Sequence, residues 1–165
     1  MDELAKEMPI ISEIEQQEFI GGNKITSIRI NGGYLISYDY ENDTLGKLTV
    51  YQPDNGGNPI VFDGVTCSNS SAPDGSAYQF NGVRVGDNPS LYFNIGDMIH
   101  EYGHYLQQEG MNNVTYLVYA GGGSLIGRIT NTDYYSIPSE KDASERGQDY
   151  MDQYYPNSGY KATGL

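Results

Sequence analysis

The sequence is poor in the residues that crosslink a chain or bind metals. Its 165 residues include one cysteine, Cys67, two histidines and no tryptophan. A single cysteine cannot form a disulfide within the chain, and it excludes a zinc site built from several cysteines. Any zinc site must therefore combine the two histidines with oxygen ligands from Glu, Asp or Tyr side chains.

The chain also lacks long hydrophobic runs and an excess of positive charge. No apolar stretch approaches the roughly 20 residues that a membrane-spanning helix needs. The formal net charge is −13, and so acidic a surface repels phosphate backbones and anionic lipids. We therefore expect neither nucleic acid nor a membrane as a partner.

The beginning of the chain lacks the pattern of a secretion signal. Residues 1–16, MDELAKEMPIISEIEQ, are acidic and do not show the basic-then-apolar order of a signal peptide. Two alternatives follow. The protein is cytoplasmic, or the chain is a mature or excised form of a secreted or cell-envelope protein.

The order of the secondary-structure patterns predicts the α+β class, with an antiparallel strand-rich half followed by helices. Residues 24–93 contain short β-rich runs between turn-forming clusters, which is typical of antiparallel hairpins. The expected strands are KITSIRI, YLISYDY, KLTVYQ, PIVF, AYQFNGVRVG and SLYF. Residues 95–155 read as helical, and no linker divides the chain, so we expect a single domain over residues 1–165.

The expected helices cover residues 10–19, 95–109, 115–129 and 139–154. Gly110 is expected to end the second of these. The third is apolar with a glycine break, which favours burial. For the fourth, Ser136 is a candidate cap and Pro138 lies near the first turn.

The segment DMIHEYGHYLQQ, residues 97–108, holds both histidines in the pattern H-E-x-x-H, as His100, Glu101 and His104. At about 100° per residue, His104 lies about 40° and Glu101 about 100° from His100 on a helix, while the apolar side chains lie between roughly 140° and 260°. Two histidines one turn apart can hold one zinc ion, and the adjacent carboxylate can act on its water. The alternative is a solvated helix face.

A third ligand is expected from the last helix. On a helical wheel Glu140 is the one carboxylate on the apolar face, and a metal ion would compensate its buried charge. The remaining acidic residues of that helix fall on the solvent side. Alternatively, Glu140 pairs with Arg128, Arg146 or a backbone N–H. Asp133, on a loop, is a competing ligand.

Three motifs carry a resemblance to known proteins. HEYGHYLQ, YLVYAGGGSLIG and YYSIPSEKDAS resemble gluzincin metallopeptidases, and more narrowly a group of small bacterial zincin-like proteins, over about residues 80–147. The resemblance implies a zincin-like metallopeptidase domain. It also implies that His100, His104 and Glu140 bind Zn²⁺ and that Glu101 is the general base.

One position departs from the pattern of that group. Ser144 stands where the group often has Asp or Asn. In gluzincins an acid one turn past the glutamate ligand commonly orients a metal-bound histidine. Asp97, one turn before His100, is a possible substitute that would accept a hydrogen bond from an imidazole N–H. The alternative is a solvated or capping aspartate.

The predicted function is zinc-dependent hydrolysis of peptide bonds in a peptide or protein substrate. Tyr134 and Tyr135 are candidate donors to the oxyanion, although a packing role fits each equally well. One alternative is a non-catalytic metal-binding surface or scaffold module. Another is a peptidase effector domain excised from a larger repeat protein, since SYDYENDTLGKLTVY resembles the tyrosine-aspartate repeats of large bacterial shell proteins.

Overall fold

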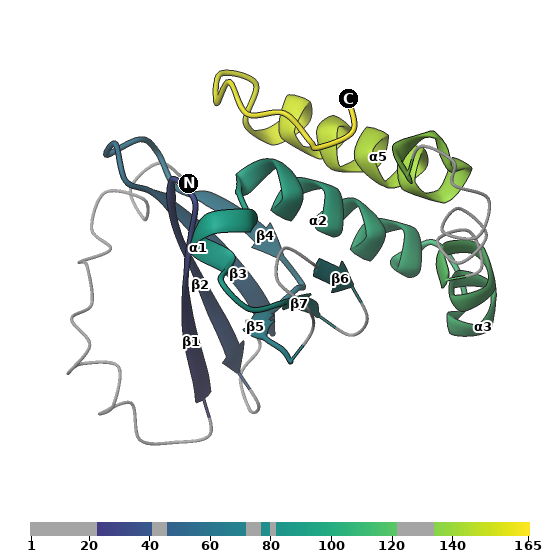
Figure 1. Cartoon of the computed structure of the whole chain (residues 1–165), viewed down its shortest axis with the longest axis horizontal. Helices are drawn as coiled ribbons and strands as arrows, with labels where there is room; N and C mark the ends of the chain where they lie inside the picture. Colours follow the sequence, from purple (N-terminus) through teal and green to yellow (C-terminus); the bar gives the residue numbers. More distant parts are fainter. Residues whose placement is uncertain (1–22, 41–45, 72–76, 80–81, 122–133) are drawn as a thin grey trace.

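The computed structural model describes residues 23–40, 46–71, 77–79, 82–121 and 134–165 (Figure 1). The predicted α+β class is confirmed, because strands make up the first half of the described chain and helices dominate the second. The helix expected over residues 10–19 lies outside the described residues. No helix in the described ranges is long and apolar enough to cross a membrane.

The first four strands form an antiparallel sheet in which neighbours along the chain pair with each other. These strands are β1 (Asn23–Ile30), β2 (Gly33–Tyr40), β3 (Lys47–Pro53) and β4 (Ile60–Asp63). Asn31 and Gly32 connect β1 to β2, and Gly32 has a φ of +88°, a conformation that glycine adopts without strain. Alternate side chains of each strand can therefore face a single core.

A smaller sheet follows, with the strand order β5-β7-β6. Its strands are β5 (Cys67–Asn69), β6 (Ala77–Gln79) and β7 (Val83–Val85). The segment AYQFNGVRVG, expected as one strand, contains the antiparallel pair β6 and β7. β5 pairs with β7 in parallel, so the prediction of antiparallel hairpins throughout is wrong here. The short, polar β5 carries no strand pattern that would have revealed this pairing.

The segment SLYF, expected to be a strand, lies mostly in the short helix α1 (Pro89–Tyr92). Pro89 occupies the first turn, where its fixed φ favours a helix. The preceding Asn88 has a φ of 52°, which turns the chain away from an extended course. Four residues of mixed apolar character do not distinguish a strand from one helical turn.

Two long helices, α2 (Ile95–Glu109) and α5 (Pro138–Tyr154), lie side by side and form the other layer of the molecule (Figure 1). The apolar face of α2 contributes Met98, Ile99 and Tyr102 to the core that it shares with the strands. Its opposite face packs on α5, where Gly103 and Gly147 allow the two backbones to approach closely. The two elements expected to carry the metal ligands are therefore in direct contact.

The ends of these helices show which capping predictions hold. Asn94 and Asp97 form a reciprocal capping box at the start of α2, and Gly110 is its C-cap as expected. The last helix begins at Pro138, and its N-cap is Ile137 without a side-chain cap. Ser136 is not the cap because it belongs to the 3₁₀ turn η4 (Tyr134–Ser136).

The apolar segment expected to be buried begins within α3 (Asn113–Tyr116) and continues as the π-helix η3 (Leu117–Gly121). Tyr116 and Ala120, one turn apart, are buried, but Leu117 and Val118 are exposed. The expected burial is therefore wrong for half of this short helix, which packs through one face only. Residues 122–129 lie outside the described part of the chain.

Candidate metal centre

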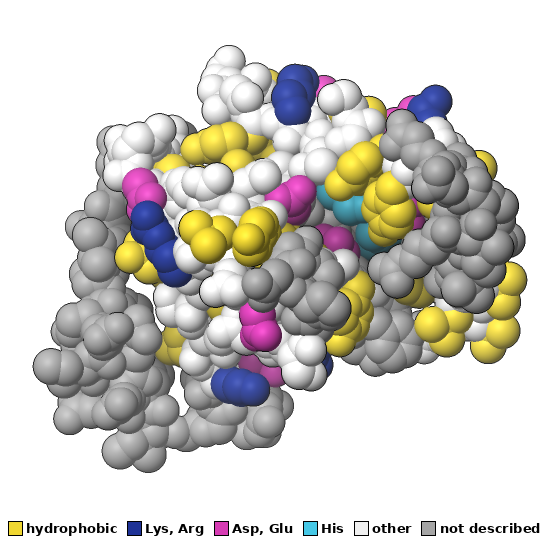
Figure 2. Space-filling model, viewed as in Figure 1, with side chains coloured by type: hydrophobic (Ala, Val, Ile, Leu, Met, Phe, Trp, Pro, Cys, Tyr) yellow, Lys and Arg dark blue, Asp and Glu magenta, His cyan; other side chains and the backbone are white. Residues whose placement is uncertain are grey.

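Helix α2 presents His100 and His104 toward α5, and Glu101 follows His100 directly in the helix. The capping box at Asn94 and Asp97 fixes the first turn of α2, so His100 and His104 follow one turn apart on the same face. All three side chains are buried. In the space-filling view the chain's two histidines are visible in a hollow between hydrophobic and acidic side chains (Figure 2). The alternative of a solvated helix face is excluded.

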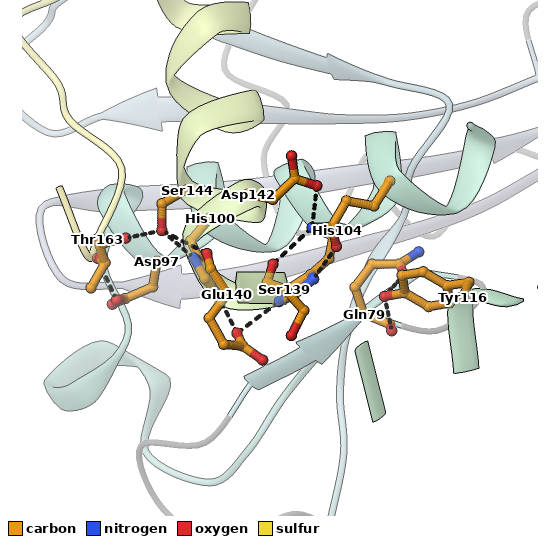
Figure 3. A network of polar contacts seen from close by, with 11 residues as sticks. Gln79, Asp97, His100, His104, Tyr116, Ser139, Glu140, Asp142, Ser144 and Thr163 are labelled. Atoms are coloured by element: carbon orange, nitrogen blue, oxygen red, sulfur yellow. Dashed lines mark hydrogen bonds and ion pairs between the residues drawn. The ribbon is translucent and has the colours of Figure 1, made fainter. Parts of the chain in front are cut away.

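Helix α5 places Glu140 between the two imidazoles. Its side chain has no solvent exposure, and the wheel argument for a single inward carboxylate is confirmed. Oε2 of Glu140 lies 3.2 Å from Nε2 of His100 and 3.0 Å from Nε2 of His104 (Figure 3). Arg146, an alternative partner for Glu140, instead pairs with Asp142.

These spacings fit a tetrahedral zinc ion. Bonds of about 2.0–2.1 Å to nitrogen and oxygen place two ligands of one ion about 3.3 Å apart. One donor atom from each of His100, His104 and Glu140 lies within 4.8 Å of the other two. These residues form the one such cluster in the described ranges, and two histidines with a carboxylate are a donor set that zinc accepts.

Gln107 determines which nitrogen of His104 carries the proton. Nδ1 of His104 lies 2.8 Å from Oε1 of Gln107. The amide nitrogen of Gln107 donates to the carbonyl oxygen of Ser139 at 2.7 Å and to Oδ2 of Asp142 at 2.8 Å, which fixes the amide orientation. Its oxygen can only accept, so the proton of His104 is on Nδ1. The lone pair of Nε2 then points toward Glu140.

Ser144 has the same effect on His100. Its Oγ lies 2.9 Å from Nδ1 of His100, 2.8 Å from the carbonyl oxygen of Thr163 and 3.1 Å from that of Glu140. The two carbonyls can only accept, and when one of them takes the single hydroxyl proton, Oγ can only accept in turn. In that arrangement Oγ accepts a hydrogen bond from Nδ1–H of His100. Ser144 then orients the His100 ring.

With two neutral imidazoles and one carboxylate, the cluster lacks a positive charge between its three acceptor atoms. Two nitrogen lone pairs face the same carboxylate oxygen, and three acceptors at hydrogen-bond distance repel one another. A cation among them relieves the repulsion, whether a metal ion or a proton. Burial lowers the pKa of His104. The hydrogen bond to Glu140 and the charges of Glu101 and Glu140 together raise this pKa by more than burial lowers it, so the net shift is upward.

Glu101 stands beside the cluster without belonging to it. It is buried, and its Oε2 has no hydrogen-bond partner in the part of the chain that the structure describes. Burial raises the pKa of Glu101, against the opposing charges of His104 and His100. A buried carboxylate oxygen without a partner is costly, and this one belongs to the residue next to His100.

Asp97 does not contact an imidazole. Its Oδ2 accepts from the backbone N–H of Asn94 at 2.9 Å, and its Oδ1 accepts from the hydroxyl of Thr163 at 2.7 Å. Of the two alternatives for Asp97, the capping aspartate is therefore correct. Asp133, the competing ligand, and Arg128, the other alternative partner of Glu140, lie outside the described residues.

The two candidate tyrosines are in different positions. The ring of Tyr135 packs edge-on against His100, with 5.5 Å between ring centroids, while Tyr134 packs on Tyr135 and is 39% exposed. Tyr116, which the sequence did not single out, is also close to the site. Burial, followed by the charges of Glu101 and Glu140, raises the pKa of Tyr116.

Three contributors to the site were missed from sequence. Gln107 had a detectable signal, because it follows His104 by three residues within the motif HEYGHYLQ. Thr163 had none, since it lies in an irregular segment 63 positions after His100. Tyr116 is one of 16 tyrosines, so its type carried no information. Thr163 and Tyr116 come near the site through tertiary packing.

Comparisons with known proteins add no family to this picture. No protein-family model, no curated protein sequence and no solved structure matches the chain. Membership of the gluzincin family stays a prediction from the three motifs.

Proposed function

We propose that the protein is a zinc-dependent peptidase in which His100, His104 and Glu140 hold the metal. The observation that carries the proposal is the unpaired, buried Oε2 of Glu101 beside three converging ligand atoms. Bound zinc would supply a Lewis acid that lowers the pKa of water to about 7 and polarises a peptide carbonyl.

The protein's own groups would then carry the proton transfers. Glu101 is adjacent to His100 in sequence and outside the ligand set, so its free oxygen would accept the proton of the attacking water. It would later deliver that proton to the leaving amine. Tyr135, packed against His100, would donate a hydrogen bond to the developing oxyanion, with Tyr134 as the alternative donor.

An extended peptide is the substrate class that the fold favours. β6 is an edge strand of the smaller sheet, and it packs beside α2, which carries the histidines. An edge strand can bind an extended chain through backbone hydrogen bonds. The hydroxyl of Tyr116 donates to the carbonyl or side-chain oxygen of Gln79 at the end of β6, and the charges of Glu101 and Glu140 act on the same tyrosine.

A non-catalytic metal-binding module is the second candidate, and burial favours it. Residues His100, Glu101, His104 and Glu140 are between 0% and 7% exposed. Structural zinc sites are closed to solvent, whereas catalytic sites keep an open position for water and substrate.

The deciding experiment combines metal analysis of the purified protein with cleavage of a broad peptide library followed by mass spectrometry. A peptidase would bind about one zinc per chain and cleave peptides. Zinc without cleavage would favour the structural module, and a protein that neither contains nor takes up zinc would contradict both functions.

Three variants assign the roles. Glu101→Gln should keep the zinc and lose cleavage, and loss of zinc in this variant would argue against its role as base. Glu140→Gln should lose the zinc. Glu145→Gln, on the exposed side of the same helix, is the matched control and should change neither property.

A further inference from the structure

The segment that follows α5 runs back to the beginning of α2. We name residues 160–165 the strap. Ala162 is buried and donates its backbone N–H to Oε1 of Gln148 on α5, at 3.0 Å. The backbone N–H of Thr163 donates to the carbonyl oxygen of Gly96 on α2, also at 3.0 Å. The strap is therefore attached to both helices that carry the metal ligands.

Thr163 is held on one side and binds Ser144 on the other (Figure 3). Its hydroxyl donates to Oδ1 of Asp97 at 2.7 Å, and its carbonyl oxygen accepts from Oγ of Ser144 at 2.8 Å. Asp97 is itself fixed by the capping box of α2. A continuous series of hydrogen bonds thus leads from the start of α2 through the strap to Ser144, and from there to His100.

The direction of the Ser144 hydroxyl matters because His100 has two competing tautomers. If Ser144 donated to Nδ1, the proton of His100 would be on Nε2, where Oε2 of Glu140 would accept it. That arrangement gives both ring nitrogens of His100 a partner without a cation, and it blocks the nitrogen that a metal needs. When Thr163 takes the hydroxyl proton, Ser144 can only accept from His100, and Nε2 stays free.

We propose that Asp97, Thr163 and Ser144 form a positioning chain that keeps Nε2 of His100 free of a proton and ready for the metal. The proposal rests on the proposed metal centre. Metal-binding histidines depend on the partner of their other ring nitrogen, and loss of such a partner typically weakens metal binding about 10–100-fold. The strap thereby becomes part of the site, although none of its residues is a ligand.

The test uses Thr163→Val, which removes the hydroxyl that binds Asp97 while keeping the shape of the side chain. Thr163→Ser keeps the hydroxyl and should behave like the parent protein. Thr49→Val is the matched control, since Thr49 is a buried threonine of β3 whose hydroxyl donates to the carbonyl of Val65 in the sheet. Ser144→Ala removes the contact to His100 directly and serves as the second test variant.

Two measurements decide the outcome. The first is the ¹⁵N chemical shifts of the His100 ring in the metal-free protein, which report the tautomer directly. The second is the zinc Kd, measured by competition with a chelator. Thr163→Val and Ser144→Ala should populate the tautomer protonated at Nε2 and bind zinc at least about tenfold more weakly. Thr163→Ser and Thr49→Val should keep the parent tautomer and affinity, even where Thr49→Val lowers the Tm.

Unchanged ring shifts and unchanged zinc Kd in Thr163→Val, despite a lower Tm, would overturn the positioning chain and leave the metal centre intact. A parent protein that binds no zinc would instead contradict the proposed metal centre. The ring shifts of the metal-free variants would still decide whether the strap sets the tautomer of His100. The two failures are therefore distinguishable.

Discussion

Gly103 of α2 lies directly against the backbone of Ala143 in α5, so closely that a Cβ on Gly103 would come within 1.8 Å of the carbonyl oxygen of Ala143. The contact is between two backbones, and neither can move without shifting a whole helix. His104 and Glu140 flank this contact in the sequence. The distance between these two candidate ligands therefore depends on the absence of a side chain at position 103.

Gly103→Ala should push the two helices apart and damage both stability and zinc binding. Overpacking in a core typically lowers the free energy of unfolding by about 1–3 kcal/mol. Because the new Cβ would meet backbone atoms, we expect a loss at or above the upper end of that range. Urea unfolding and zinc titration measure the two effects. Gly110→Ala is the control, because its Cβ would meet its nearest neighbour at 3.5 Å. Normal zinc affinity in Gly103→Ala would contradict the dependence of the site on this contact.

Gln107→Ala should weaken zinc binding by about 10–100-fold, because His104 loses the acceptor that fixes its tautomer. Competition with a chelator measures the change. Gln108→Ala is a control on the next residue, since the side chain of Gln108 donates to Asn113 at the surface. Equal zinc affinity in the two variants would show that the contact between Gln107 and His104 does not orient the ligand.

Helical periodicity explains why the convergence of these three side chains could be predicted from sequence. The wheel positions of His100, His104 and Glu140 depend on regular helices, and α2 has the bounds that were expected for it. Glu140 was identified as the inward carboxylate of α5 and is fully buried. Where the backbone is regular, the sequence pattern determines which side chains face one another.

The surroundings of the ligands could not be predicted in this way. Thr163 lies in an irregular segment, so no period connects it to His100 or Asp97. Ser144 stood out in the sequence only as a departure from the pattern of the resembling group, because the strap carbonyl beside it is invisible in the sequence. The prediction of a strand at SLYF is wrong for a related reason, because neighbouring residues decide the conformation of so short a segment.

Cys67 should be almost inert in the folded protein. It is buried, and desolvation together with the charge of Glu101 raises the pKa of its thiol to about 12. Thiol-specific reagents at pH 8 should therefore label it at least about 10³-fold more slowly than in urea, because labelling needs an opening of the fold. Rapid labelling of the folded protein would contradict the burial of Cys67.

The same shift predicts how stability depends on pH. In the unfolded chain the thiol loses its proton near pH 9, while in the folded chain it keeps the proton to about pH 12. The unfolded state therefore binds fewer protons between these values, and the free energy of unfolding should fall by up to about 1.4 kcal/mol per pH unit there. Cys67→Ala should lack this contribution. The comparison is cleanest between pH 9 and pH 10, before tyrosines ionise.

Tyr135 should be the tyrosine on which turnover depends, given the proposed peptidase activity. Its ring packs against His100, whereas Tyr134 packs on Tyr135 and is partly exposed. Removing one oxyanion donor typically lowers kcat by about 10²–10³-fold. Tyr135→Phe keeps the ring contact with His100, so it should lower kcat by about that factor while leaving zinc affinity and KM nearly unchanged.

Tyr134→Phe and Tyr116→Phe should change kcat by less than about threefold, which steady-state kinetics on one peptide substrate would measure. A larger loss of kcat in Tyr116→Phe than in Tyr135→Phe would identify Tyr116 as the donor instead. Burial, followed by the charges of Glu101 and Glu140, raises the pKa of that tyrosine.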